Sequence, residues 1–103
     1  MPAILSVTAS RIRDGKLPRA LETYGKLKKI IERLGGKARV VSQAYGAAPL
    51  TIAFIIESAG WAEFGVLSDK ADKDSELQAL LAEIRANPYS DIVARAVSTE
   101  LDV

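Results

Sequence analysis

The sequence contains no cysteine and no histidine. Without cysteine the chain can form no disulfide, and it offers no thiolate nucleophile and no sulfur ligand for zinc or an iron–sulfur cluster. Without histidine it lacks the commonest acid–base group at neutral pH and the usual ligand of transition metals and haem. We therefore expect no metal and no cofactor, and carboxylates are the only general bases that remain.

Long apolar segments and a large excess of one charge are also absent. The opening MPAILSVTASRIR has neither the basic start nor the long apolar stretch of a signal peptide, and no run is long enough to span a bilayer. The net charge is only +1, which gives little bulk attraction for a polyanion. We therefore expect a cytoplasmic protein with no membrane and no nucleic acid among its partners.

The length suits one domain, and we expect residues 1–103 to form it. A chain of this size buries only about two-thirds of its unfolded surface, so a partner would add to its stability. Hydrophobic residues make up 49% of the sequence and charged residues 26%. This slight apolar excess is compatible with a buried subunit interface.

Residues 38–57, ARVVSQAYGAAPLTIAFIIE, have the composition of a β-hairpin. β-Branched and aromatic residues fill both arms, and Gly46 and Pro49 interrupt them. We place the loop at 46–50 and the second strand at 50–58. The polar side chains then share one face, and the other face carries Val40, Ile52, Phe54 and Ile56. In this register the facing pairs are Tyr45 with Thr51, Val41 with Ile55, and Arg39 with Glu57.

The residues before the hairpin predict a strand and a helix. Strict alternation over 3–12 sets Leu5, Val7 and Ala9 on one side of a strand and Ile4, Ser6, Thr8 and Ser10 on the other. Apolar residues then recur every three or four positions from Pro18 to Leu34, which predicts an amphipathic helix ended by Gly35 and Gly36. Gly25, in mid-helix, marks either a close approach to the sheet or a tolerated defect.

The residues after the hairpin predict further helix and a last strand. Residues 61–71 and 75–86 carry helical apolar stripes, and the sequence leaves open whether they form one kinked helix or two. Pro88 stops this region. The alternation over 90–101 predicts a strand whose faces stay unassigned, because Arg95 falls in phase with its valines.

The order strand, helix, strand, strand, helix, strand is that of a ferredoxin-like α+β fold. It predicts a four-stranded antiparallel sheet with the helices on one face. The opposite face, to which we assign Ile4, Val41 and Ile55, is too apolar to be left in water. A second copy of the same sheet is the simplest cover, so we expect a homodimer through this face.

Several segments resemble a known superfamily, the dimeric α/β barrels. They are ERLGGKARVVSQAYG before an apolar strand, ESAGWAEFG after it, the charged SDKADKDSELQALL and the closing VSTEL. The nearest likeness is to the NIPSNAP-like and antibiotic-biosynthesis-monooxygenase-like groups. The resemblance implies a homodimer whose two sheets form a barrel, with a pocket between each sheet and its helices or inside the barrel. Members include cofactor-independent monooxygenases, haem-degrading enzymes, isomerases, dehalogenases and proteins of unknown role.

Five residues are candidates for ligand binding, whereas no catalytic residue can be named. In the monooxygenase-like members a tryptophan, an asparagine and an arginine near the pocket are associated with the chemistry. Trp61 and either Arg39 or Arg95 match this pattern. The single asparagine does not, because it lies beside a proline at a helix stop. Trp61 otherwise serves as a packing anchor, and Arg39 with Glu57 forms either a ligand clamp or a plain cross-strand ion pair. The candidates are Trp61, Arg39, Glu57, Thr8 and Tyr45.

Two functions therefore remain open. The first is a small homodimeric α/β-barrel protein of undefined role that binds a small, partly apolar molecule. The alternative is a cofactor-independent monooxygenase or isomerase that acts on an aromatic or polyketide-like substrate.

Overall fold

The computed structural model describes residues 2–42, 50–101 and 103. Tyr45 and most of the predicted hairpin loop lie outside these ranges. The elements follow the predicted order, with the second helical region divided in two. They are β1 (Ile4–Ile12), α1 (Leu17–Arg33), β2 (Lys37–Ser42), β3 (Thr51–Ser58), α2 (Trp61–Lys73), α3 (Ser75–Ala86) and β4 (Ser90–Thr99).

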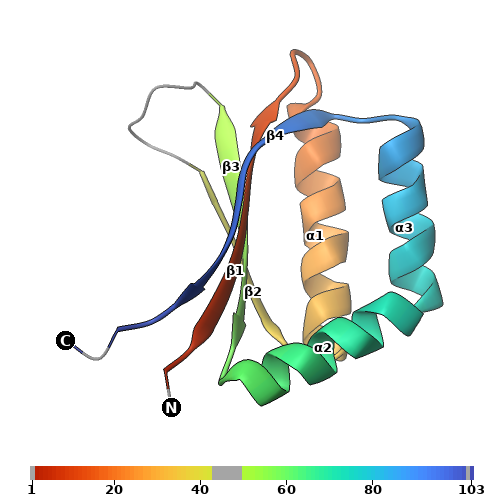
Figure 1. Ribbon diagram of the computed structural model, residues 1–103. Helices are drawn as coiled ribbons and strands as arrows, with labels where there is room; N and C mark the ends of the chain where they lie inside the picture. Colours follow the sequence, from red (N-terminus) through yellow and green to blue (C-terminus); the bar gives the residue numbers. More distant parts are fainter. Residues whose placement is uncertain (1, 43–49, 102) are drawn as a thin grey trace.

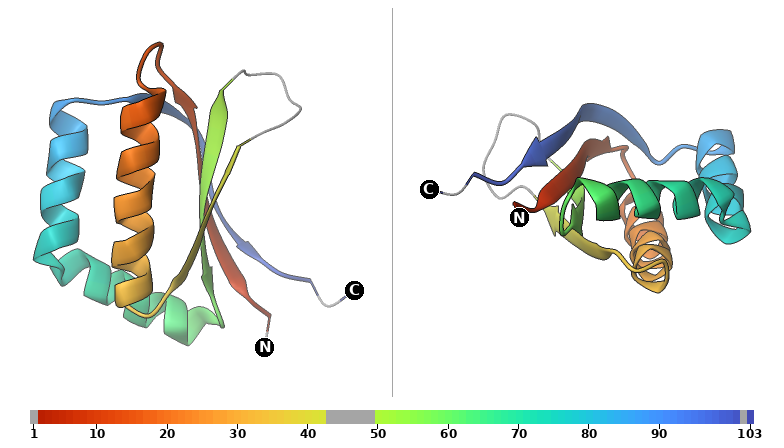
Figure 2. Two further views of the ribbon diagram at one scale, coloured as in Figure 1. Left: turned by 180° about the vertical axis from the view of Figure 1, so that it is seen from behind. Right: turned by 60° about the horizontal axis from the view of Figure 1, so that its bottom comes forward.

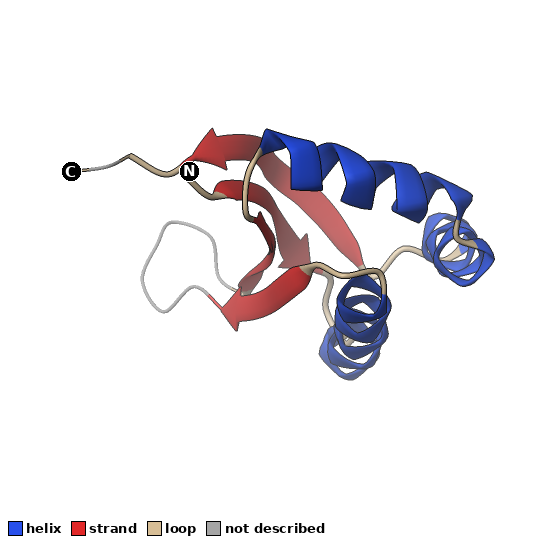
Figure 3. Cartoon of the chain, turned by 90° about the horizontal axis from the view of Figure 1, so that it is seen from below, coloured by secondary structure: helices blue, strands red, loops and turns tan. Residues whose placement is uncertain are grey.

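The four strands form one sheet in the order β2-β3-β1-β4, and every neighbouring pair is antiparallel. All three helices lie on the same side of this sheet (Figures 1 and 3). Helices α1 and α3 run side by side, and α2 crosses near one end of both (Figure 2). The predicted ferredoxin-like βαββαβ fold is thus confirmed. No helix within the described ranges is both long and apolar enough to cross a membrane.

Helix α1 forms where the periodicity predicts it. Pro18 lies in its first turn, where a missing N–H costs nothing. Its buried side includes Tyr24 and Leu27, which pack in the main core. Gly35 follows the helix with φ of 100°, the left-handed conformation expected of a helix-ending glycine.

Two glycines near this helix differ in their surroundings. A Cβ added at Gly25 would meet nothing within 4 Å, so the structure excludes the close approach to the sheet and leaves the tolerated defect. A Cβ added at Gly36 would lie 2.8 Å from Leu67 Cδ2 and 2.9 Å from Ile31 Cγ2. Gly36 is therefore the position where the absence of a side chain permits α1, β2 and α2 to meet.

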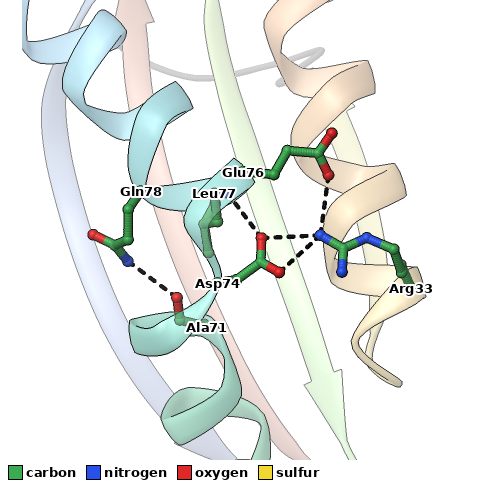
Figure 4. Close-up of polar contacts among 6 residues, drawn as sticks. All are labelled: Arg33, Ala71, Asp74, Glu76, Leu77 and Gln78. Carbon is green, nitrogen blue, oxygen red and sulfur yellow. Dashed lines mark hydrogen bonds and ion pairs between the residues drawn. The ribbon is translucent and has the colours of Figure 1, made fainter.

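Asp74 divides the second helical region into α2 and α3. Its backbone is extended, with φ of −79° and ψ of 115°, and its carboxylate accepts a hydrogen bond of 2.9 Å from the N–H of Leu77. Arg33 Nη2 donates to both Asp74 oxygens at 2.9 Å and to Glu76 Oε1 at 3.0 Å (Figure 4). The Leu77 N–H and then Arg33 lower the pKa of Asp74 below its ordinary value. One carboxylate thus caps α3 and connects it to the last turn of α1.

The predicted hairpin register is wrong by two residues. Lys37 lies opposite Glu57, Arg39 opposite Ile55 and Val41 opposite Ala53. A shift of two residues leaves every side chain on its predicted face, because the side-chain period of a strand is two. The polar and apolar pattern therefore fixed the faces of β2 and β3 and left their register undetermined.

The sheet has a helix face, which the helices cover, and an open face. On β1 the helix face carries Ile4, Thr8 and Ser10, and the open face carries Leu5 and Val7. The assignment of Ile4 to the open face is therefore wrong: it lies opposite Ser58 and is only 1% exposed. The open face is still apolar, but its large residues are Leu5, Val7, Val41 and Ile55, with Ala9, Ala53, Ala94 and Ala96 among them.

A β-bulge explains why the faces of the last strand could not be assigned. Ala9 lies opposite Ala94, whereas the next residue of β1, Ser10, lies opposite Ile92. Val93 is therefore an extra residue, and it changes the phase of the alternation. As a result Ile92 and Arg95 both belong to the helix face.

Candidate functional site

A cavity of about 300 Å³ lies between the helix face of the sheet and the helices. Thr8 and Ser10 of β1, Phe54 and Ile56 of β3, and Ile92 and Arg95 of β4 form its floor. The helices contribute Tyr24, Leu27, Ile31, Ala71, Leu77, Leu81 and Ile84, and Tyr89 and Ser90 complete the lining. Its volume and its mainly apolar walls, with a few polar groups, are typical of a small-molecule site.

The cavity exists because β1 presents small polar side chains to the helices at this point. Thr8 lies opposite Phe54 on one side and Arg95 on the other, and Ser10 lies opposite Ile52 and Ile92. Hydroxyl side chains leave space where larger apolar residues would fill it. The mixed side of the predicted first strand thus faces the helices, and its polar residues are the floor of the cavity.

Three aromatic rings, those of Tyr24, Tyr89 and the floor residue Phe54, form an aromatic wall at one side of the cavity. The Tyr24 ring lies 6.1 Å from the ring of Phe54, and it meets the ring of Tyr89 edge-on at 5.6 Å. The guanidinium of Arg19 lies over Tyr89, 5.5 Å from the ring centre. Burial, with a smaller contribution from Tyr24, raises the pKa of Tyr89. Its phenol therefore stays protonated near neutral pH, where it can donate a hydrogen bond but cannot act as a base.

Of the described residues that line this cavity, Arg95 is the only charged one. Arg95 is exposed to solvent, so the cavity opens to solvent beside this residue of β4. Within the described parts of the chain no hydrogen bond or ion pair engages it. By contrast, Arg13 pairs with Asp91 at 2.8 Å and Arg33 with Asp74 at 2.9 Å. Arg11 and Arg85 resemble Arg95 in forming no hydrogen bond or ion pair with a described residue.

The structure separates the predicted site residues. Thr8 lines the cavity. Trp61 begins α2, is 59% exposed, and packs edge-on against Phe64 at 5.8 Å, outside the cavity lining. Arg39 and Glu57 form a 3.3 Å ion pair on the open face, with side chains 61% and 34% exposed. Their roles in binding remain predictions.

Glu57 also borders a second cavity, of about 190 Å³, beside Gly36, Lys37, Ser58 and Glu63. Ser58 Oγ is buried there without a hydrogen-bond partner among the described atoms. The charges around this cavity are of both signs, and it lies at the edge of the sheet. In the described ranges no cluster of three or more acidic side chains could hold a metal ion.

The aromatic wall was not predicted from the sequence. In the sequence, Tyr24 falls within the apolar stripe of the predicted helix from Pro18 to Leu34, and Tyr89 directly follows Pro88, which stops the next helical region. One signal in the sequence did point to the cavity. Arg95 alternates in step with the valines of the predicted last strand, and a charged residue among apolar ones on a strand face can indicate a binding site.

No family model matches the sequence, and no curated protein matches it closely enough to count as a relative. Solved structures do match. An uncharacterised NIPSNAP domain protein from Burkholderia xenovorans superposes with a TM-score of 0.72 at 18% identity, over 97% of this chain and 94% of that one. A NIPSNAP family protein from Agrobacterium tumefaciens gives a TM-score of 0.70 at 17% identity, over 98% and 93% of the two chains.

The chain has the ferredoxin-like fold of the NIPSNAP domain proteins. A dimeric ferredoxin-like protein of unknown function from Thermobifida fusca has the same fold, with a TM-score of 0.58 at 18% identity over 96% of this chain and 90% of that one. The resemblance inferred from the sequence is therefore confirmed at the level of the fold. A NIPSNAP fold does not by itself specify a reaction or a ligand.

Proposed function

We propose that this NIPSNAP-fold protein is a homodimer that binds a small, partly apolar molecule in the cavity between sheet and helices. The observation that carries the proposal is the cavity itself, a space of about 300 Å³ with an aromatic wall and a hydroxyl-lined floor. A domain of this size normally packs its interior without such space. An apolar guest would recover the contacts that the lining side chains lack.

The open face supports the homodimer. Leu5, Val7 and Ile55 are only half-buried there, Val41 is 43% exposed, and alanines keep the surface between them flat. The chain exposes 6778 Å², whereas a folded monomer of 11.1 kDa is expected to expose about 5,700 Å². The difference, about 1,100 Å², is more than the roughly 800 Å² that one partner buries in a standard interface, so the excess is large enough for such an interface. The related fold from Thermobifida fusca is described as dimeric.

The cavity favours binding over turnover. No described residue of its lining carries a carboxylate, and the chain has no histidine, so the described lining offers a bound molecule neither of the two commonest kinds of general base. The alternative of a cofactor-independent oxygenase or isomerase, and the cytoplasmic location, stay predictions from the sequence.

A small neutral fluorescent probe, 1-naphthylamine, tests the proposal. We expect it to bind the wild-type protein at one probe per chain, with a rise in fluorescence, and native mass spectrometry of gently purified protein should give the mass of two chains. Thr8→Phe fills the floor of the cavity and should abolish probe binding. Thr99→Phe makes the same change at the exposed end of β4 and should leave it unchanged.

Circular dichroism should show that both variants fold. If Thr8→Phe binds the probe as well as the wild type does, the cavity is not the binding site. If the native mass is that of one chain at micromolar concentration, the homodimer is wrong.

A further inference from the structure

The position of Arg95 decides the chemistry of the ligand. The side chain follows the bulge at Val93, lies opposite Thr8 in the pairing of β4 with β1, and lines the cavity. Ser10 and Ser90 lie on the same lining. A guanidinium and several hydroxyl groups thus gather along the sheet side of a space whose helix side is apolar.

The charge of Arg95 is not balanced inside the site. Among the described residues, none that lines the cavity is acidic, and none is bonded to the guanidinium. A cation beside low-dielectric walls attracts anions more strongly than one in open solvent does, and it repels cations. The site therefore discriminates between ligands by charge as well as by apolar surface.

The shape of the guanidinium narrows the choice of anion. Its planar fork of N–H donors matches the two oxygens of a carboxylate, and the hydroxyls of Thr8 and Ser10 can complete the hydrogen bonds of that group. At roughly 30 Å³ for each non-hydrogen atom, as in liquid water, the space holds about ten such atoms. One arginine also suits a single negative charge better than the double charge of a phosphate monoester.

We infer that the ligand is a monocarboxylate with an apolar body of medium length, whose carboxylate is bound by Arg95 and whose body lies against Tyr24, Phe54 and Leu81. This inference rests on the proposed binding function and adds the chemical class of the ligand. Arg95 is a binding residue and the principal determinant of specificity.

Competition against 1-naphthylamine tests the inference. Octanoate, octan-1-ol and octylamine share the same alkyl chain and differ in the charge of the head group. We expect octanoate to displace the probe at a concentration at least about tenfold lower than octanol does, and octylamine to be the weakest competitor. Arg95→Gln should weaken octanoate about 10- to 100-fold, the loss expected for charge-assisted hydrogen bonds, and leave octanol unchanged.

Arg85→Gln is the matched control, because Arg85 is an exposed arginine of α3 that does not line the cavity. It should bind octanoate as the wild type does. If octanoate competes no better than octanol, or if Arg95→Gln binds octanoate with wild-type affinity, the inference is wrong while the binding function stands. If the probe itself does not bind, the proposed function fails first.

Discussion

The homodimer can be tested at one residue, Val7. It lies at the middle of β1, one of the two inner strands, and its side chain points to the open face. Its cross-strand neighbours are Ile55 on β3 and Ala96 on β4, neither of which carries a charge. Ile55 is less suitable for a charged substitution, because Arg39 lies directly opposite and could pair with the new carboxylate.

The expected effect of Val7→Asp follows from burial at a two-fold interface, where each substitution occurs twice. Fully burying a valine stabilises a structure by about 1.5–3 kcal/mol, and Val7 is already half-buried in the single chain, so burying the remainder in two copies contributes about 1.5–3 kcal/mol to the dimer. At 1.4 kcal/mol for each tenfold change, dimer dissociation should become about one to two orders of magnitude easier. Burying two unpaired carboxylates adds to this loss.

Sedimentation velocity at several protein concentrations measures the result. The wild type should sediment as a dimer and Val7→Asp as a monomer at micromolar concentration. Val7→Thr keeps the β-branched shape and should remain largely dimeric, and Val66→Asp places the same charge at a 55% exposed position of α2 and should have no effect. A dimeric Val7→Asp of unchanged stability would refute the assignment of the open face as the interface.

Two further predictions concern the framework that holds the cavity. Gly25→Ala should raise the free energy of unfolding by about 1 kcal/mol, whereas Gly36→Ala should lower it because its Cβ would lie 2.8 Å from a neighbouring side chain. Urea unfolding measures both changes, and a shift of both variants in the same direction would contradict this prediction. The Leu77 N–H and Arg33 hold the pKa of Asp74 in the folded protein below its ordinary value of 3.8. The stability that the ionised Asp74 contributes is therefore complete above pH 3.8 and is lost as the pH falls through the lower pKa of the folded state. Asp74→Asn keeps a capping oxygen and should flatten this acid-induced loss in thermal unfolding, and an unchanged pH dependence would show that Asp74 has no part in it.

The sequence predicted most of the fold because the physical signals were local. Alternation placed β1, helical spacing placed α1, and the glycine after α1 adopts the expected left-handed conformation. The prediction of the hairpin register was wrong because it, too, rested on a local signal. A pattern of period two cannot distinguish registers that differ by two residues, so only the faces of β2 and β3 were determined.

The sequence predicted less of the candidate site than of the fold. Thr8 is one of the predicted ligand-binding residues and does line the cavity, whereas the sequence assigns Arg95 to no face of its strand. The obstacle was the bulge at Val93, which is set by the pairing of β4 with β1 and leaves no periodic signal in β4 alone. The aromatic wall depends on contacts between residues far apart in the chain, such as Tyr24 with Tyr89. Local patterns carry no information on such contacts.

Strand β1 connects the two proposed properties of the protein. Its odd-numbered residues, such as Val7, form the open face, and its even-numbered ones, such as Thr8, form the cavity floor. A partner sheet on the open face would hold β1 and β4 rigid. Strand β4 is an edge strand that pairs only with β1, and its residues are exposed along almost the whole strand. Arg95 lies on that strand. Dimerisation through the open face would therefore help to fix the position of Arg95, although the partner would lie on the side of the sheet away from the cavity.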